Sequence, residues 1–311
     1  AIPPPIRILS ALGKIFSKGI RKIEGDILSK EYFALNMWRK IILVLVVLLV
    51  LGSFFAWDNK RVSLTKQKIQ IENLPENFSG LKILQISDLH NQVFGIKQQK
   101  IIDLAVESKP DLIFITGDLI DYRHPKVDIA LELVDSLREI APVYLVSGNH
   151  EIWSEEWGNL QKELLSMGVK IMDDKIKIME RNGEKIYILG VADGGNKIGE
   201  SSNKFEEKIR KIVTGLNEKQ VKILLSHRPE KFLNYVENGI DLVFSGHAHG
   251  GQVRLPLIGA LVAPHQGLFP KYTSGVYRHA KTNMVVSRGL GNSVLPLRIF
   301  NNPELVLVEL E

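Results

Sequence analysis

The sequence predicts an α/β fold, in which buried strands alternate with helices, preceded by one helix that crosses a membrane. Three observations predict it. Short apolar runs recur along most of the chain, and each ends in Ser or Thr before polar, glycine-rich residues. Stretches of helical length separate these runs, an alternation typical of a sheet covered by helices. Residues 41–57, which precede all of these runs, carry no charge and form a segment just long enough to span a bilayer.

The composition limits the function classes. The 311 residues give room for one large domain and an appendage. The formal net charge of +5 fits an anionic substrate or an anionic membrane surface. It does not favour nucleic acid, which requires basic residues concentrated on one face. The chain has no cysteine, which excludes disulfides, thiolate nucleophiles and cysteine-ligated zinc.

The N-terminal part indicates a membrane protein. Residues 1–40 are basic and partly apolar, and they fit either an amphipathic helix on an anionic membrane or a disordered basic tail. Trp38 and Trp57 bracket residues 41–57 as interfacial anchors do. The rival reading is a signal peptide, but no small-x-small cleavage site follows. We expect a single-pass cell-membrane protein whose catalytic part is extracytoplasmic, because the longer series of positive residues lies on the N-terminal side.

After a linker and first strand in residues 58–80, the domain is expected to cover residues 81–311. Its apolar runs, read as strands buried on both faces, are residues 81–87, 111–116, 142–147, 221–226 and 241–245. The expected helices are residues 98–108, 127–140, 155–167, 204–216 and 229–238. Asn182-Gly183 predicts a hairpin within residues 171–190, and residues 282–287 and 304–310 return to strands. Residues 253–262 are read as a core loop or as an exposed lip that contacts lipid.

Polar clusters follow all five apolar runs, at the carboxyl ends of the predicted strands, where α/β sheets bind their ligands. In an extended segment His247 and His249 point the same way, so both could face one metal site. The candidate ligands carry oxygen and imidazole donors, which suit manganese, iron or zinc. They are too many for one tetrahedral ion but suffice for two ions that share a carboxylate, an arrangement used to displace groups at phosphorus. They are Asp88, His90, Asp118, Asn149, His227, His247 and His249.

Five short motifs occur in the order Asp-x-His, Gly-Asp, Gly-Asn-His-Glu, a lone strand-end His and Gly-His-x-His. This order resembles that of the calcineurin-like metallophosphoesterases, and the resemblance runs from about residue 82 to about residue 310. The resemblance implies a four-layer α/β/β/α sandwich and two divalent metal ions, manganese first, with zinc or iron as alternatives. It implies one metal on Asp88, His90 and His249, and the other on Asn149, His227 and His247. Asp118 would bridge the two. His150 and Asp118 would be the catalytic pair, with His150 protonating the leaving oxygen or stabilising the transition state. Glu151 stands where family members often have Asp, and we expect either carboxylate to orient the imidazole.

The anchor and residues 250–256 and 287–291 resemble membrane-associated bacterial phosphoesterases, including UDP-2,3-diacylglucosamine pyrophosphatases. This subgroup implies cleavage of a phosphodiester or pyrophosphate, in a cell-envelope or lipid-linked substrate, by in-line attack of a dimetal-bound hydroxide. A specific UDP-2,3-diacylglucosamine pyrophosphatase and a non-catalytic metal-binding scaffold are the alternatives. Arg254, Arg288 and Arg298 are candidates to bind substrate phosphate, or else form surface ion pairs. We expect ordinary surface or packing roles for His124, His265 and His279, and packing rather than substrate stacking for Tyr122 and Trp153. Asp121 and Asp193 are read as turn residues, with a place next to a metal ligand or at the lip of the substrate site as the alternative.

Overall fold

The computed structural model describes residues 36–194, 203–292 and 298–311. The chain divides into two units, Ala1–Phe54 and Phe55–Glu311, and we call the second the domain. An apolar helix runs over Asn36–Asp58, with a mean hydropathy of 2.6 in its most apolar window. At about 1.5 Å per residue it is roughly 34 Å long, enough to cross the ~30 Å core of a bilayer. The predicted basic segment lies, up to residue 35, outside the described residues.

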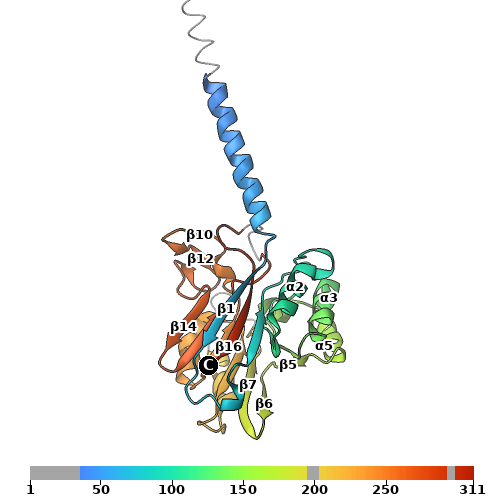
Figure 1. Cartoon of the computed structure of the whole chain (residues 1–311), viewed down its shortest axis with the longest axis vertical. Helices are drawn as coiled ribbons and strands as arrows, with labels where there is room; N and C mark the ends of the chain where they lie inside the picture. The colour runs from blue at the N-terminus through green and yellow to red at the C-terminus, as the bar shows by residue number, and fades with distance from the viewer. Residues whose placement is uncertain (1–35, 195–202, 293–297) are drawn as a thin grey trace, which may run out of the picture. The chain divides into compact units, whose positions relative to one another are not determined.

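Two mixed sheets form the centre of the domain (Figure 1). The first has the order β1 (Ser63–Ile69), β16 (Glu304–Leu310), β2 (Lys82–Ile86), β3 (Leu112–Ile115), β4 (Val143–Leu145) and β5 (Lys170–Ile171). The second has the order β14 (Gly275–His279), β15 (Thr282–Val286), β9 (Leu242–Ser245), β8 (Lys222–Ser226), β7 (Glu184–Val191) and β6 (Lys175–Arg181). Strands β2 to β5 are parallel, as are β7, β8, β9 and β15.

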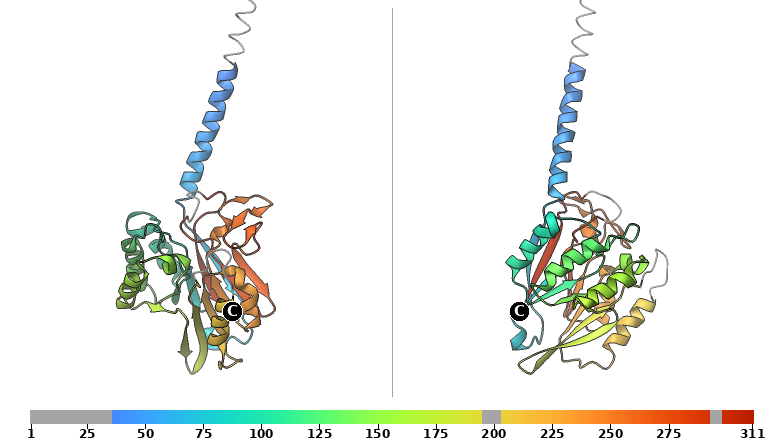
Figure 2. Two further views of the ribbon diagram at one scale, coloured as in Figure 1. Left: turned by 180° about the vertical axis from the view of Figure 1, so that it is seen from behind. Right: turned by 90° about the vertical axis from the view of Figure 1, so that its right-hand side faces the viewer.

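Helices cover the outer face of each sheet (Figure 2). On the first sheet these are α2 (Gln99–Ser108), α3 (Val127–Arg138) and α5 (Trp157–Ser166). On the second they are α6 (Asn203–Val213) and α7 (Phe232–Glu237). Shorter helical turns are η1 (Glu76–Phe78), η2 (Ile96–Gln98), α4 (Asn149–Trp153), η3 (Pro229–Lys231) and η4 (His249–Gly251). Two small hairpins, β10 (Arg254–Leu255) with β11 (Gly259–Ala260) and β12 (Val262–Ala263) with β13 (Gly267–Leu268), follow η4.

Three separate apolar clusters confirm the predicted four-layer sandwich. Along β2, Leu84 and Ile86 pack outward against α2, α3 and α5, whereas Ile83 packs inward. This alternation is that of a strand whose two faces are both buried. Between the sheets, Ile83 and Phe114 meet Phe244 of the second sheet. The third cluster joins α6 and α7 to the outer face of that sheet.

The five predicted strand ends lie at one end of the sandwich, and a buried side chain ties the two sheets together there. Gln85 Nε2 in β2 donates to Thr116 Oγ1 at 3.0 Å and to Ser245 O, at the end of β9, at 2.8 Å. Because leaving such a buried amide unpaired costs about 1–3 kcal/mol, this contact fixes the loop after β9 beside the loops after β2 and β3. The halves of the candidate site come from these loops.

Candidate metal centre

The seven predicted ligands lie in loops that leave five strands, β2, β3, β4, β8 and β9, and all seven are buried. In one group, His90 Nε2 lies 3.2 Å from His249 Nε2, which lies 3.5 Å from Asp88 Oδ1. In the other, His227 Nε2 lies 3.1 Å from Asp118 Oδ2 and 3.1 Å from His247 Nδ1. Each group brings imidazole nitrogens and carboxylate oxygens within reach of one cation.

Asp118 stands between the two groups. Its Oδ2 atom lies 3.6 Å from His90 Nε2 in addition to its contact with His227. Its Oδ1 atom accepts the His150 backbone N–H at 2.8 Å, which directs Oδ2 toward both groups. This is the position that a bridging carboxylate requires.

The residues fit divalent cations. His227 Nδ1 lies 2.7 Å from Thr116 O and donates to it, so Nε2 is the nitrogen that faces the centre. Asn149 Oδ1 and His90 Nδ1 are buried and have no hydrogen-bond partner within the described part of the chain. Buried polar atoms are ordinarily paired, so an unpaired amide oxygen beside the centre fits a cation ligand. The donors are oxygen and nitrogen without sulfur, as manganese, iron and zinc accept.

His247 and His249 belong to different groups, as the family resemblance implied and in contrast to the spacing argument that both could face one site. The spacing rule holds for extended backbone, but these two residues have φ values of 64° and 49°. Asp88, His90 and Asp118 also have positive φ, at 53°, 45° and 57°. Such non-glycine residues each cost about 1–3 kcal/mol, and that strain is typical of functional sites.

Close backbone contacts hold the carboxylates. A Cβ added at Gly246 would lie 1.9 Å from Ser87 Oγ and 2.5 Å from Asp88 Oδ2. One added at Gly148 would lie 2.2 Å from Asp118 Oδ1. Only glycine lets the loops approach these two carboxylates so closely.

Burial and mutual charge set the protonation of the metal-free centre. Burial opposes charge on His227, yet Asp118 raises the pKa of His227 to about 10. Burial likewise works against an ionised Asp118, but His227 and His150 hold the pKa of Asp118 well below its usual value. Burial lowers the pKa of His90 to about 3, and it holds the pKa of His247 and of His249 well below the usual value of a histidine. These three rings are therefore neutral, the form in which imidazole binds a metal.

His150 lies beside the first group, with its ring edge-on to that of His90 at 4.3 Å. Its Nδ1 accepts the Tyr122 backbone N–H at 3.2 Å and lies 3.7 Å from Asp121 Oδ2. Because Nδ1 accepts, the proton of the neutral ring is on Nε2. The rings of Tyr122 and Trp153 pack against the imidazole.

Glu151 does not orient that imidazole, in contrast to the expectation. Its carboxylate accepts backbone N–H groups of Asp118, Ile120 and Gly148 at 2.7, 3.2 and 2.8 Å. Glu151 thereby joins the loop after β3 to the loop after β4. Asp121, read as a turn residue with a place next to the site as the alternative, is the carboxylate nearest to His150 Nδ1 among the described ion pairs.

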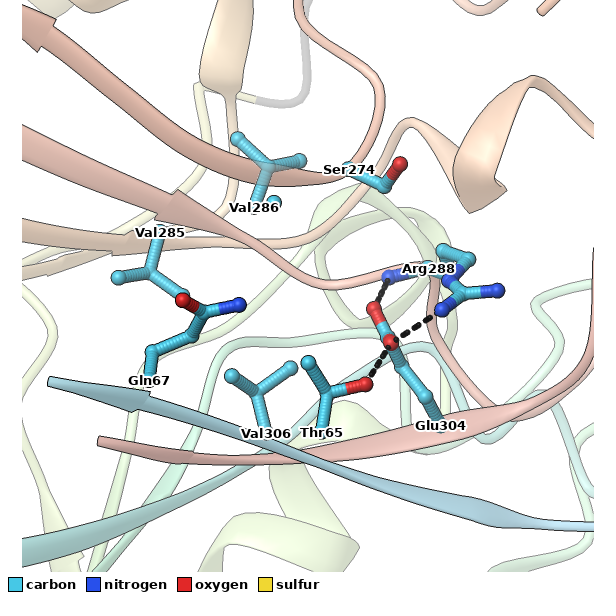
Figure 3. A pocket seen from close by; sticks show the side chains of 9 residues that line it. Thr65, Gln67, Ser274, Val285, Val286, Arg288, Glu304 and Val306 are labelled. Atoms are coloured by element: carbon cyan, nitrogen blue, oxygen red, sulfur yellow. Dashed lines mark hydrogen bonds and ion pairs between the residues drawn. The ribbon is translucent and has the colours of Figure 1, made fainter. Parts of the chain in front are cut away.

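The three arginines are all engaged within the protein. Arg298 is 1% exposed, and its guanidinium donates to Arg288 O and Gly291 O and lies 3.5 Å from His249 Nδ1. These contacts hold the Arg298 guanidinium beside His249, and substrate binding by Arg298 stays a prediction. Arg254 donates to Gly250 O at 2.9 Å. Arg288 pairs with Glu304 at 3.0 Å in a cavity of about 170 Å³, where Thr65 also donates to Glu304 (Figure 3). For the half-buried Arg254 and Arg288, substrate binding stays a prediction.

Two features next to the centre were missed in the sequence. His265 Nδ1, in the turn between β12 and β13, lies 3.0 Å from His247 Nε2. Arg228 forms a buried bidentate pair with Asp193, at 2.6 and 2.9 Å. Neither pair leaves a periodic or spacing signal in the sequence, although Arg228 directly follows the predicted ligand His227. His124 and His279 are exposed, as expected.

The comparisons with known proteins agree with this geometry. The family model for calcineurin-like phosphoesterases matches residues 81–251. The metallophosphoesterase YkuE of Bacillus subtilis is 31% identical over 262 residues, which cover 80% of this chain and 86% of that protein. A transmembrane protein with a metallophosphoesterase domain from Danio rerio is 27% identical and covers 97% of this chain and 68% of its own. The phosphodiesterase YaeI of Escherichia coli is 27% identical over 76% of this chain and 84% of its own.

Proposed function

Since this chain belongs to the calcineurin-like phosphoesterase family, we propose that it is a membrane-anchored hydrolase that cleaves a phosphodiester or pyrophosphate with the help of two divalent cations. The observation that carries the proposal is the position of Asp118 Oδ2, which lies 3.1 Å from His227 Nε2 and 3.6 Å from His90 Nε2. One carboxylate oxygen thus faces two sets of imidazoles. The relative named a phosphodiesterase supports the choice of a diester.

Asp88, His90 and His249 would hold one cation, and Asn149, His227 and His247 the other, with Asp118 shared. Divalent cations at such a centre supply Lewis-acid chemistry and make water a stronger nucleophile near neutral pH. We favour manganese, with zinc or iron as alternatives, because the donor set lacks sulfur. The protein holds these donors at fixed positions through the Thr116 carbonyl and the close approach of Gly148 and Gly246.

His150 would donate a hydrogen bond from Nε2 to the leaving oxygen and so stabilise the negative charge that develops there. Its Nδ1 accepts the Tyr122 N–H, so Nε2 carries the proton and is free of that contact. The Asp121 carboxylate, 3.7 Å from Nδ1, would help to hold the ring in place beside the first group. Packing of Tyr122 and Trp153 against the imidazole limits its rotation. Loss of one such donor costs about 10²–10³-fold in rate.

The test is hydrolysis of a chromogenic phosphodiester and the matching monoester by the full chain in detergent. The protein is stripped of metal and given manganese, zinc, magnesium or nickel. We expect metal-restored diester cleavage that is lost in His150→Ala but kept in His124→Ala, an exposed control. Bound metal without cleavage of either ester would reject a broad phosphodiesterase. Cleavage of a UDP-diacylglucosamine lipid but not of simple diesters would select the specific pyrophosphatase, and cleavage of neither would leave the non-catalytic scaffold.

A further inference from the structure

The two hairpins after η4 expose large apolar side chains. Leu257 is 108% exposed and Leu268 is 75% exposed, and Ile258 and Phe269 stand next to them in the chain. Leu261 N–H donates to Val253 O at 3.0 Å and Phe269 N–H to Leu261 O at 2.9 Å, so the hairpins form one structure. We call Leu257, Ile258, Leu268 and Phe269 the apolar lip. An apolar group of this kind, left in water, marks a contact surface.

Through residues 298–300, hydrogen bonds and one ring contact connect this structure to residues 55–59, at the start of the domain. Arg254 N–H donates to Ile299 O at 3.0 Å, and the ring of Phe300 meets that of Phe55 edge-on at 5.6 Å. Asn59 and Arg298 exchange two hydrogen bonds, at 2.8 and 2.7 Å. The hairpins lie at the end of the domain where residues 55–62 enter it (Figures 1 and 2). If residues 36–58 span a bilayer, residues 55–58 lie at its surface, and the hairpins lie beside them.

Basic residues surround the same helix end. Trp57, Lys60, Arg61 and Lys100 line a cavity of about 430 Å³ in which Asp103 is the one acidic residue. The Arg61 guanidinium lies 5.4 Å from the centre of the Trp57 ring. Tryptophan with basic residues is the composition of a membrane interface, and anionic headgroups complement its charge. A second copy of this chain, joined through the same face, would bring like charges together.

The same hairpin structure reaches the candidate metal centre. His265, whose Nδ1 lies 3.0 Å from His247 Nε2, is three residues before Leu268. Three residues span at most about 10 Å, which is comparable to the ~5–10 Å by which apolar groups enter the headgroup and acyl boundary. A phosphate held at the centre would therefore lie near headgroup level when the lip is in the acyl region.

We infer that the apolar lip inserts into the bilayer that holds the helix and presents the centre to a phosphorylated amphiphile embedded in that bilayer. The substrate part of this inference rests on the proposed function. The insertion part does not, because it depends only on the exposed side chains, the basic residues and the helix end.

Fluorescence tests the insertion without any enzymatic assay. The chain has no cysteine, so Leu257→Cys and Leu268→Cys can each carry one polarity-sensitive dye on the full chain in vesicles of anionic and zwitterionic phospholipid. Ile178→Cys is the control, because Ile178 is 51% exposed in the edge strand β6, at the other end of the domain (Figure 1). We expect both lip dyes to shift to the blue and to be quenched by nitroxide-labelled lipids, and the control dye to do neither. If the lip dyes emit like the control dye, the inference is overturned. A blue shift without quenching by the labelled lipids would also overturn it, because the lip would then contact a second copy of this chain or another protein instead of lipid.

The substrate part is tested with Leu268→Glu and Phe269→Glu combined. We expect kcat/KM for a long-chain phosphodiester in vesicles to fall about tenfold or more. A loss of this size is expected when at least one large apolar side chain is no longer buried in the bilayer. The value for a short soluble diester should stay unchanged. An equal loss for both substrates, or for neither, would contradict the substrate part. Failure of the unmodified protein to cleave either ester would refute the proposed function and leave the fluorescence result standing.

Discussion

Gly246→Ala should disturb the centre although it adds only a methyl group. The new Cβ would lie 1.9 Å from Ser87 Oγ and 2.5 Å from Asp88 Oδ2, so at least one of them must move. The carboxylate has little freedom, because the His247 backbone N–H donates to both of its oxygens, at 3.0 and 3.2 Å. Overpacking of this kind costs about 1–3 kcal/mol. For a domain of this size that lowers the unfolding midpoint by roughly 2–12 °C.

The same displacement should weaken metal binding about 10–100-fold, as changes next to metal ligands do. Thermal unfolding of the metal-free chain and titration with manganese measure the two effects separately. Gly158→Ala is the matched control, because a Cβ there meets nothing within 4 Å and the helix α5 should gain about 0.5–1 kcal/mol. The reasoning is refuted if Gly246→Ala unfolds and binds manganese like Gly158→Ala.

Three further predictions follow from the site. His150→Ala should lower kcat for a diester about 10²–10³-fold, because the leaving oxygen loses a hydrogen-bond donor. The bound metal, measured by atomic emission, should stay unchanged; loss of metal would mean that His150 holds the centre together. Asp193→Asn replaces the bidentate carboxylate partner of the buried Arg228 with a neutral amide and leaves Glu230, at 3.4 Å, as the remaining carboxylate. It should cost about 1.5–3 kcal/mol in urea unfolding, whereas Asp135→Asn, in an exposed pair, should change stability by less than about 1 kcal/mol. Because Asp118 raises the pKa of His227 to about 10, His227 must lose a proton when metal binds, so the affinity for manganese should fall as the pH falls. Calorimetry in buffers of different ionisation enthalpy should report this proton release. An affinity that does not depend on pH would contradict this protonation state.

The strand ends were predictable because one physical rule connects sequence to site. Continuous apolar runs mark strands buried on both faces, and the carboxyl ends of parallel strands lie at one edge. Residues such as Asp88, Asp118 and Asn149 follow β2, β3 and β4, so they meet without any knowledge of the loops. The helices were predictable for the same reason, since α2, α3 and α5 each bury one apolar face on the first sheet.

The finer contacts depend on loop conformation, which the residue pattern does not specify. His247 and His249 separate because their φ values are positive, so the two-residue spacing rule fails there. Arg298 is buried because the last loop returns to Asn59, 239 residues earlier in the chain, and no local pattern indicates so long a contact. Glu151 binds backbone N–H groups of Asp118 and Ile120 in the neighbouring loop and of Gly148 in its own loop, and no residue pattern specifies which donors a loop brings to a buried carboxylate.

Anomalous diffraction from crystals of the manganese-loaded chain tests the central claim most directly. We predict two manganese peaks, one contacted by Asp88, His90 and His249 and the other by Asn149, His227 and His247. Asp118 Oδ2 should touch both. A single peak, or peaks that Asp118 does not share, would contradict the proposal that this centre is dinuclear.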